Sequence, residues 1–193
     1  MKRPANIVPL AVAFEGGLGL AAVGLAWWLD VPLAHRLTPS TGALVRGAIG
    51  LIPLLLMLAY ATRSRWRPLA ELRRQVEQLV GELFRDVSWV GLAAVSIAAG
   101  VGEELLFRGA LQPLAERWFG PAAGLIVVSL IFGALHAASR TYFILATLVG
   151  LYLGWLAQEY DDLLAPIFIH AAYDFVALWM LVDGTPEQRY AAD

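Results

Sequence analysis

Six long apolar stretches constrain the fold of this chain more than any other feature of its sequence. A helix rises 1.5 Å per residue, so about 20 apolar residues cross a hydrocarbon core ~30 Å thick. Because lipid offers no hydrogen bonds, a crossing segment must pair its backbone groups internally, as a helix does. We therefore predict an all-α fold, a polytopic membrane helix bundle with about six transmembrane helices. The stretches are residues 7–29, 44–62, 89–111, 121–138, 142–158 and 163–182.

The composition agrees with a membrane protein. Apolar residues make up 59% of the 193 residues and charged residues 16%, against about 45–50% and about 25% in typical soluble domains. The chain has no cysteine, which excludes disulfides, thiolate metal sites and cysteine nucleophiles. We expect one integral membrane domain over residues 1–193, a flexible polar tail at 184–193, and no nucleic-acid partner.

The first apolar stretch has a competing interpretation. A basic start precedes residues 7–29, as in a cleaved signal peptide, but the run is too long for one and contains Glu15. We interpret it as a transmembrane helix. Glu15 is expected to face the bundle interior and form a hydrogen bond there, rather than act as a fourth metal ligand. The nearby Gly16, Gly17 and Gly19 suit close helix packing.

Residues 68–85 differ from the six stretches. Apolar side chains recur there at helical spacing, and charged side chains occupy the other faces. This pattern predicts an amphipathic helix that lies in the membrane interface, in contact with lipid. The apolar positions are Leu69, Leu72, Val76, Leu79, Val80 and Leu83.

The distribution of lysine and arginine predicts the orientation of the bundle. One set of loops holds ten basic residues, including the run Arg63, Arg65 and Arg67, whereas the other set holds Arg36 and Arg117. Because basic loops stay in the cytoplasm, we predict a multi-pass protein of the cell (inner) membrane with a cytoplasmic amino terminus.

When the loops are set aside, six further ionisable side chains lie inside the apolar stretches. Such groups are costly in a membrane and are expected to have either partners or a function. They fall into three sets along the chain: Glu103, Glu104 and Arg108; His136; His170 and Asp174.

Helical spacing relates the first two sets. Glu104 and Arg108 are four residues apart and can pair along their own helix, whereas Glu103 points about 100° away and is left free. Glu103 lies 17 residues before Gly120, and His136 lies 16 residues after it. If Gly120 is the turn of a helical hairpin, Glu103 and His136 sit at nearly equal depth.

The third set shares one helix face, because His170 and Asp174 are four residues apart. The expected depth of His170 in the membrane agrees less well with the depth of Glu103 and His136. His170 lies roughly 12 Å along its helix, whereas Glu103 and His136 lie roughly 24 Å from their turn. Agreement requires the turn at Gly120 to protrude beyond the bilayer.

A carboxylate and two imidazoles at one depth can hold and deprotonate a water molecule. Glu103, His136 and His170 could also ligate a divalent metal, usually zinc, with the water in an open position. A mechanism without a metal is also compatible with these residues. Both alternatives predict water-mediated hydrolysis inside the membrane.

These residues form three motifs that resemble those of the CPBP family of intramembrane proteases. That family groups type 2 CAAX prenyl endopeptidases with bacteriocin-processing and immunity-type proteins. The resemblance extends over about residues 87–182, the expected protease core. The first motif is Glu103, Glu104 and Arg108, the second is Phe132 and His136, and the third is His170 with Asp174.

The resemblance implies an endopeptidase that acts on a membrane-associated protein or peptide. Glu103 would be the general base on the attacking water, which His136 helps to hold. His170 and the residue at position 174 would stabilise the oxyanion. Because the family's need for a metal is disputed, the cofactor stays open. The supporting residues would be Glu104, Arg108 and Phe132.

Asp174 departs from the family pattern, which has asparagine at this position. Asparagine can donate a hydrogen bond to an oxyanion, whereas ionised aspartate only accepts. Either Asp174 is protonated and donates, or it orients His170 or ligates a metal and leaves the oxyanion to His170. We favour the second interpretation. The departure also leaves room for a protein that has lost activity.

Two other functions are compatible with the sequence. A non-enzymatic membrane scaffold or immunity protein could use the same fold. A small proton-coupled transporter could use intramembrane acids and histidines as a relay, although the absence of visible repeat halves in the sequence argues against it.

Overall fold

The computed structural model describes residues 7–183, which are helical apart from short connections and contain no strand. The all-α prediction is confirmed. The predicted flexible tail at 184–193 and the basic start lie outside the described residues. The helices are α1 (Ile7–Trp28), α2 (Thr41–Arg63), α3 (Arg67–Phe84), α4 (Trp89–Glu104), α5 (Gln112–Phe119), α6 (Pro121–Leu135), α7 (Arg140–Tyr160) and α8 (Leu164–Asp183), with a 3₁₀ turn η1 (Ala34–Leu37) and a π-helical segment η2 (Leu105–Leu111).

Five helical segments are long and apolar enough to cross a membrane. They are α1, α2, α7, α8 and the continuous run Trp89–Phe119, in which η2 joins α4 to α5. The fourth predicted span, residues 121–138, is shorter than expected, because α6 ends at Leu135 after 15 residues. His136 adopts φ −98° and ψ 7° and forms the C-cap of α6. Residues 7–183 therefore contain five full-length candidate spans and one shorter apolar helix.

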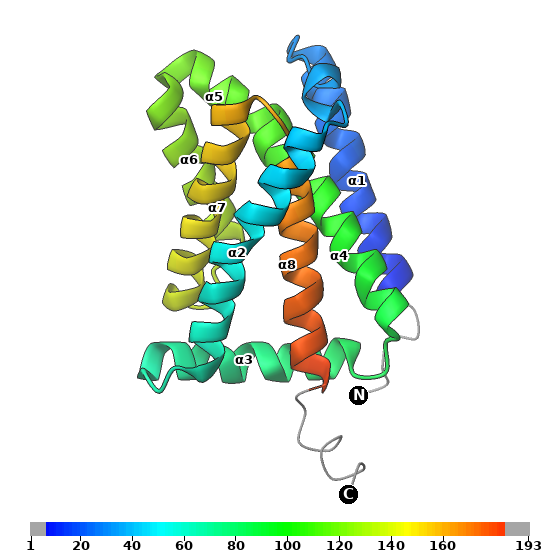
Figure 1. Ribbon diagram of the computed structural model, residues 1–193, viewed down its shortest axis with the longest axis vertical. Helices are drawn as coiled ribbons and strands as arrows, with labels where there is room; N and C mark the ends of the chain where they lie inside the picture. Colours follow the sequence, from blue (N-terminus) through cyan, green and yellow to red (C-terminus); the bar gives the residue numbers. More distant parts are fainter. Residues whose placement is uncertain (1–6, 184–193) are drawn as a thin grey trace, which may run out of the picture.

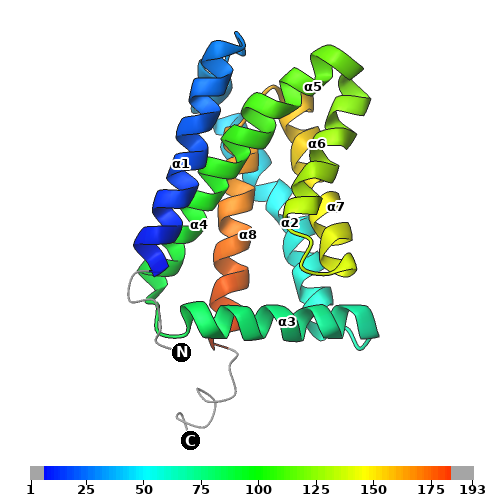
Figure 2. The same cartoon turned by 180° about the vertical axis from the view of Figure 1, so that it is seen from behind.

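The long helices stand side by side, and α3 lies across one end of the bundle (Figures 1 and 2). Helix α8 occupies the middle and packs against both α4 and α2. Helix α1 covers α4, while α6 and α7 pair on the other side of the bundle. The connection between α5 and α6 lies at the end opposite α3.

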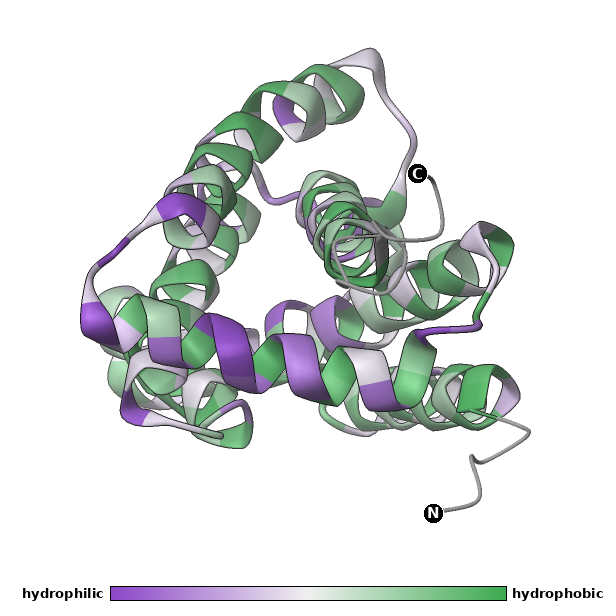
Figure 3. Cartoon of the chain, turned by 90° about the horizontal axis from the view of Figure 1, so that it is seen from below, coloured by the Kyte–Doolittle hydropathy of each residue, from purple (hydrophilic) through white to green (hydrophobic). Residues whose placement is uncertain are grey.

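Helix α3 has one apolar and one charged side. Seen from below, hydrophilic residues recur along α3, whereas the long helices are mostly hydrophobic (Figure 3). Leu69, Leu72 and Val80 are buried, while Glu71 and Arg74 are exposed. The predicted amphipathic helix is confirmed, with bounds one residue earlier than expected. Its position in a membrane interface stays a prediction.

Two glycines let α4 approach its neighbours closely. A Cβ atom at Gly102 would overlap the backbone oxygen of Glu15 in α1, and one at Gly100 would lie 2.8 Å from Ala171 in α8. A Cβ atom at Gly19 in α1 would lie 3.6 Å from the Cα of Gly102. This close packing fixes the backbone of α4 just before the two adjacent glutamates.

Much of the outer surface of the bundle is apolar. Leu20 and Trp27 in α1, for example, are 78% and 83% exposed, as expected for side chains that face lipid rather than water. A Cβ atom at Gly16 or Gly17 would meet nothing within 4 Å. The prediction of close packing in α1 therefore holds for Gly19 and is wrong for the other two glycines.

Candidate active site

Glu103, the second-last residue of α4, directs its carboxylate toward two histidines. Its Oε2 atom lies 3.8 Å from Nε2 of His136 and 4.0 Å from Nε2 of His170. This oxygen is buried and has no hydrogen-bond partner among residues 7–183. The structure thus brings together the three side chains that the spacing singled out, and gaps of this size leave room for a bridging water.

Glu104 points elsewhere and is fully buried with Arg108. Its Oε1 atom accepts a hydrogen bond from Nη1 of Arg108 at 2.7 Å, as the spacing of four residues indicated. The same oxygen accepts from Nδ1 of His170 at 2.8 Å. The sequence gives no sign of this second contact, because His170 lies 66 residues away. Glu104 therefore orients a histidine of the site as well as neutralising an arginine.

His136 is held by the residue one turn before it. Its Nδ1 lies 2.9 Å from the carbonyl oxygen of Phe132, so Nδ1 carries the donated hydrogen and Nε2 faces Glu103. The rings of Phe132 and His136 are 4.4 Å apart, and the guanidinium of Arg108 lies 4.5 Å from the Phe132 ring. Phe132 therefore connects the buried ion pair with the histidine.

Asp174 lies one turn after His170 in α8, with 31% of its side chain exposed. Its Oδ2 atom is 3.5 Å from Nε2 of His170. Glu104 makes a shorter contact, to Nδ1 of the same ring, so Asp174 is not the only carboxylate beside His170. The orienting role of Asp174 stays a prediction.

The depth mismatch of His170 is resolved by the shape of the bundle. The α5–α6 connection extends further along the long axis of the bundle than the first turn of α8 (Figures 1 and 2). Glu103 is therefore further from the Gly120 turn than His170 is from the start of α8, yet both side chains lie at the same height in the bundle, where they approach each other.

The π-helical segment η2 follows Glu104 directly and carries Arg108. Segments of this kind are frequent at functional sites. Arg36 in η1 donates to the carbonyl oxygens of Arg108 and Ala157 at 3.0 and 3.1 Å, which ties η2 to α7. Burial lowers the pKa of Arg36, and the nearby carboxylate of Asp161 opposes that shift. The sequence placed Arg36 in a polar loop and did not indicate this role.

Residues 85–176 match the family model described as type II CAAX prenyl endopeptidase Rce1-like. The match spans just under half of the chain and contains all three motifs. These residues form an Rce1-like region of the CAAX protease family. The resemblance seen in the motifs is thereby confirmed at the level of the family. No curated protein and no solved structure matches the chain.

A cavity of about 330 Å³ adjoins the site of the Rce1-like region. Most of its walls are apolar side chains from α2, α3, α7 and α8, so α3 closes it on one side. The polar side chains that line it near the site are His136, Tyr142, His170, Tyr173 and Asp174. The candidate site therefore opens onto a largely apolar space.

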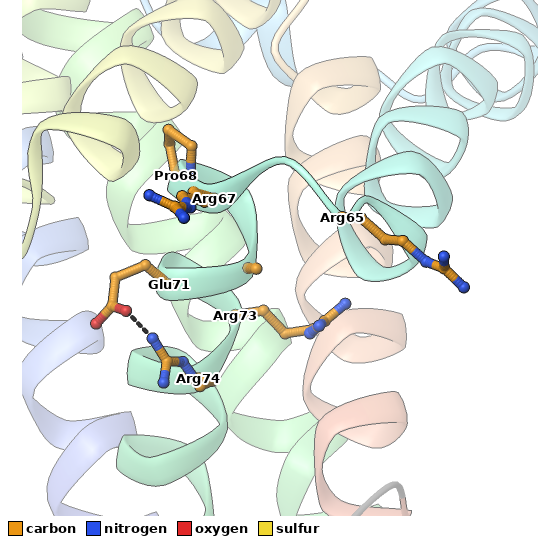
Figure 4. Close-up of a pocket in the computed structure, with 7 residues that line it drawn as sticks. Arg65, Arg67, Pro68, Glu71, Arg73 and Arg74 are labelled. Carbon is orange, nitrogen blue, oxygen red and sulfur yellow. Dashed lines mark hydrogen bonds and ion pairs between the residues drawn. The ribbon is translucent and has the colours of Figure 1, made fainter.

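A second hollow, of about 530 Å³, lies where α2 turns into α3. Arginines surround it, and Arg74 pairs with Glu71 (Figure 4). This is the basic loop that the charge pattern singled out. The arginines are Arg65, Arg67, Arg73 and Arg74.

Glu15 lies in the part of α1 that packs on α4. Its Oε2 atom is buried and has no hydrogen-bond partner among residues 7–183, and its carboxylate interacts electrostatically with that of Glu103. The expected interior hydrogen bond is therefore not made by this oxygen. The interior location itself is as predicted.

The residues fit a metal in chemistry but not in spacing. Two imidazole Nε2 atoms and one carboxylate oxygen form a donor set typical of zinc. Bonds of about 2.0–2.1 Å would bring neighbouring donors to about 3.4 Å in a tetrahedral site, closer than the observed 3.8 and 4.0 Å. Within residues 7–183, no three His, Asp or Glu side chains are arranged to hold a metal ion. The spacing therefore favours the alternative without a metal, and whether zinc binds at Glu103, His136 and His170 is left to the chelation experiment described below.

Proposed function

We propose that this protein is an intramembrane endopeptidase in which Glu103 activates the attacking water. The observation that carries the proposal is the buried, unpaired Oε2 of Glu103, which faces Nε2 of His136 and of His170. A carboxylate so placed has no hydrogen bond to give up before it takes a proton, which suits a general base. The family match supports the same class of reaction.

The reaction proceeds through an oxyanion. Glu103 takes a proton from water while the water oxygen bonds to the peptide carbonyl carbon, whose π electrons move to oxygen. The carbonyl then re-forms, the C–N bond breaks, and Glu103 returns the proton to the leaving nitrogen. The products are a carboxylic acid and an amine, and Glu103 ends in its starting form.

The two histidines hold the water in this scheme. Each directs Nδ1–H to an oxygen, the carbonyl of Phe132 or the carboxylate of Glu104. The neutral rings therefore present the lone pairs of Nε2 toward Glu103. The water donates one hydrogen to Oε2 of Glu103 and the other to one of these Nε2 lone pairs, which leaves a lone pair of its oxygen for the substrate.

The substrate class follows from the surroundings of the site. The apolar cavity favours a membrane-associated protein or peptide over a soluble one. The arginines around the α2–α3 turn favour a cytoplasmic location for that end of the bundle in the cell (inner) membrane.

Two substitutions test the proposal in the full-length protein. Glu103→Gln and His136→Ala are expected to abolish cleavage, measured by mass spectrometry of new protein termini in membranes that contain each variant. Glu82→Gln on the exposed side of α3 is the matched control and should cleave normally. Cleavage that persists in Glu103→Gln would overturn the proposal.

A second function is favoured by one observation. Two buried carboxylate oxygens without partners, in Glu15 and Glu103, could relay protons across part of the membrane. Proton flux into liposomes that requires Glu103, with no peptide product, would identify a proton-coupled transporter. If neither proton flux nor a peptide product is found, a scaffold or immunity protein on the same fold is favoured.

A further inference from the structure

The proposed reaction needs a hydrogen-bond donor that its four principal side chains do not supply. Oxyanion stabilisation requires donors aimed at the oxygen on which charge develops. The carboxylates of Glu103 and Asp174 only accept. The Nδ1–H groups of His136 and His170 are already donated to other oxygens, and a ring that carries its hydrogen at Nδ1 alone can only accept at Nε2.

Tyr142 is an unused donor beside this site. It lies in the first turn of α7 and lines the same cavity as His136, His170 and Asp174. Its ring meets that of His136 edge to face, with centroids 6.0 Å apart.

The hydroxyl of Tyr142 has no hydrogen-bond partner within residues 7–183. Ser139 Oγ accepts a hydrogen bond from the backbone N–H of Tyr142, not from its hydroxyl. A tyrosine hydroxyl that is removed from water usually finds an acceptor. One that faces a cavity without an acceptor is available to a ligand in that cavity.

Local structure explains why Tyr142 returns to the site. Helix α6 ends at Leu135, and Ser139 caps α7 by accepting from the backbone N–H of Tyr142 at 3.2 Å. The short connection between the two helices therefore places Tyr142 next to His136, while its ring packs against the cluster that contains Phe132 and Ala146.

We propose that the hydroxyl of Tyr142 donates the hydrogen bond that stabilises the oxyanion, the task that the family's asparagine would perform at position 174. The inference rests on the proposed function. The hydroxyl keeps its proton throughout, so the bonds that form and break are those of the peptide hydrolysis described above.

The first experiment removes only the hydroxyl. The full-length protein in liposomes is assayed with a fluorogenic peptide that carries a prenylated CAAX sequence and with peptides copied from cleavage sites found in host membranes. Tyr142→Phe is expected to lower kcat by about 10²–10³-fold with little change in KM, the loss seen when one oxyanion donor is removed. Tyr160→Phe, at the other end of α7, is the control and should retain activity.

The second experiment returns a donor to the site. Asp174→Asn in the Tyr142→Phe background supplies an amide N–H at the position of the family's asparagine. We expect kcat to recover by at least about tenfold, which is part of the loss assigned to one donor. A ring that mattered for packing alone would not be rescued by a new amide across the cavity.

The outcomes separate the two proposals. If Glu103→Gln is inactive while Tyr142→Phe keeps full kcat, a protonated His170 or another group supplies the donor and this inference is wrong. A loss in Tyr173→Phe but not in Tyr142→Phe also overturns it. If the unaltered protein cleaves none of these peptides and Glu103→Gln changes no host termini, the proposed function fails and this inference fails with it.

Discussion

At the residue scale, two adjacent glutamates serve different purposes because their surroundings differ. Glu104 is fully buried, and one of its oxygens binds both Arg108 and His170. Glu103 has a buried oxygen without a hydrogen bond that faces two histidines. The first carboxylate is suited to holding the structure together, and the second is suited to proton transfer.

This difference predicts that substitutions of the two glutamates have effects of very different size on stability. Glu104→Gln keeps an oxygen that can accept from His170 but leaves Arg108 as a buried charge without a counter-ion, so we expect a loss of about 3–5 kcal/mol in unfolding free energy. Glu103→Gln should cost little. Denaturation of both variants in detergent measures the difference.

A second substitution checks the cause. Adding Arg108→Met to Glu104→Gln removes the unpaired charge and should recover much of the loss. If the double variant is no more stable than Glu104→Gln, the ion pair is not the source of the effect.

The spacing of the donor atoms gives a further expectation at this scale. Because Glu103, His136 and His170 are spread more widely than zinc ligands, cleavage should survive extensive chelation and metal-free preparation. Activity is measured before and after chelation, with zinc added back. A loss that zinc restores would show that the side chains contract around a metal.

At the element scale, the close approach of α1 and α4 positions the site. Gly102 sits against the backbone of Glu15, and the next residue is Glu103. There is no room for a side chain at position 102, so the glycine there sets the distance between α1 and α4. In the same way, the π-helical segment after Glu104 places Arg108 where Arg36 holds its carbonyl group.

A methyl group at Gly102 should therefore separate the two helices. We expect Gly102→Ala to lower the unfolding free energy by about 1–3 kcal/mol, as overpacking does, and to reduce activity by displacing Glu103. Gly16→Ala is the matched control in α1, because its Cβ would meet nothing within 4 Å. Equal stability of the two variants, measured by thermal denaturation, would contradict the packing argument.

At the scale of the whole molecule, the two ends of the bundle differ in charge. Helix α3 and the arginines of the α2–α3 turn lie at one end, and the α5–α6 connection lies at the other (Figure 1). The apolar cavity reaches from the site to α3. A substrate that enters past α3 would therefore approach from the more basic end of the bundle.

The absence of cysteine makes this orientation directly measurable. Gln78→Cys in α3 and Phe119→Cys at the end of α5 place single thiols at exposed positions at opposite ends. A membrane-impermeant maleimide should label Phe119→Cys in intact cells and Gln78→Cys only in inverted vesicles, as basic loops in the cytoplasm require. The reverse labelling would invert the predicted topology.

The sequence alone determined the relations that depend on regular helix geometry. Apolar length predicted the helices, the spacing of four residues predicted the Glu104–Arg108 pair, and counting from Gly120 placed Glu103 level with His136. These follow because rise and rotation per residue are the same in every α-helix. Counting over-extended α6 to residue 138, since the sequence does not reveal where a backbone leaves helical angles.

Only the tertiary structure decided which helix faces met. The contact of His170 with Glu104 and the place of Tyr142 beside His136 depend on how separate helices pack, as does the overlap that Gly102 avoids at Glu15. Such contacts arise from side-chain volumes across an interface, which no count along one helix contains. The motifs thus identified the reacting groups, while the packing of α1, α4, α7 and α8 determined which of them was left free to react.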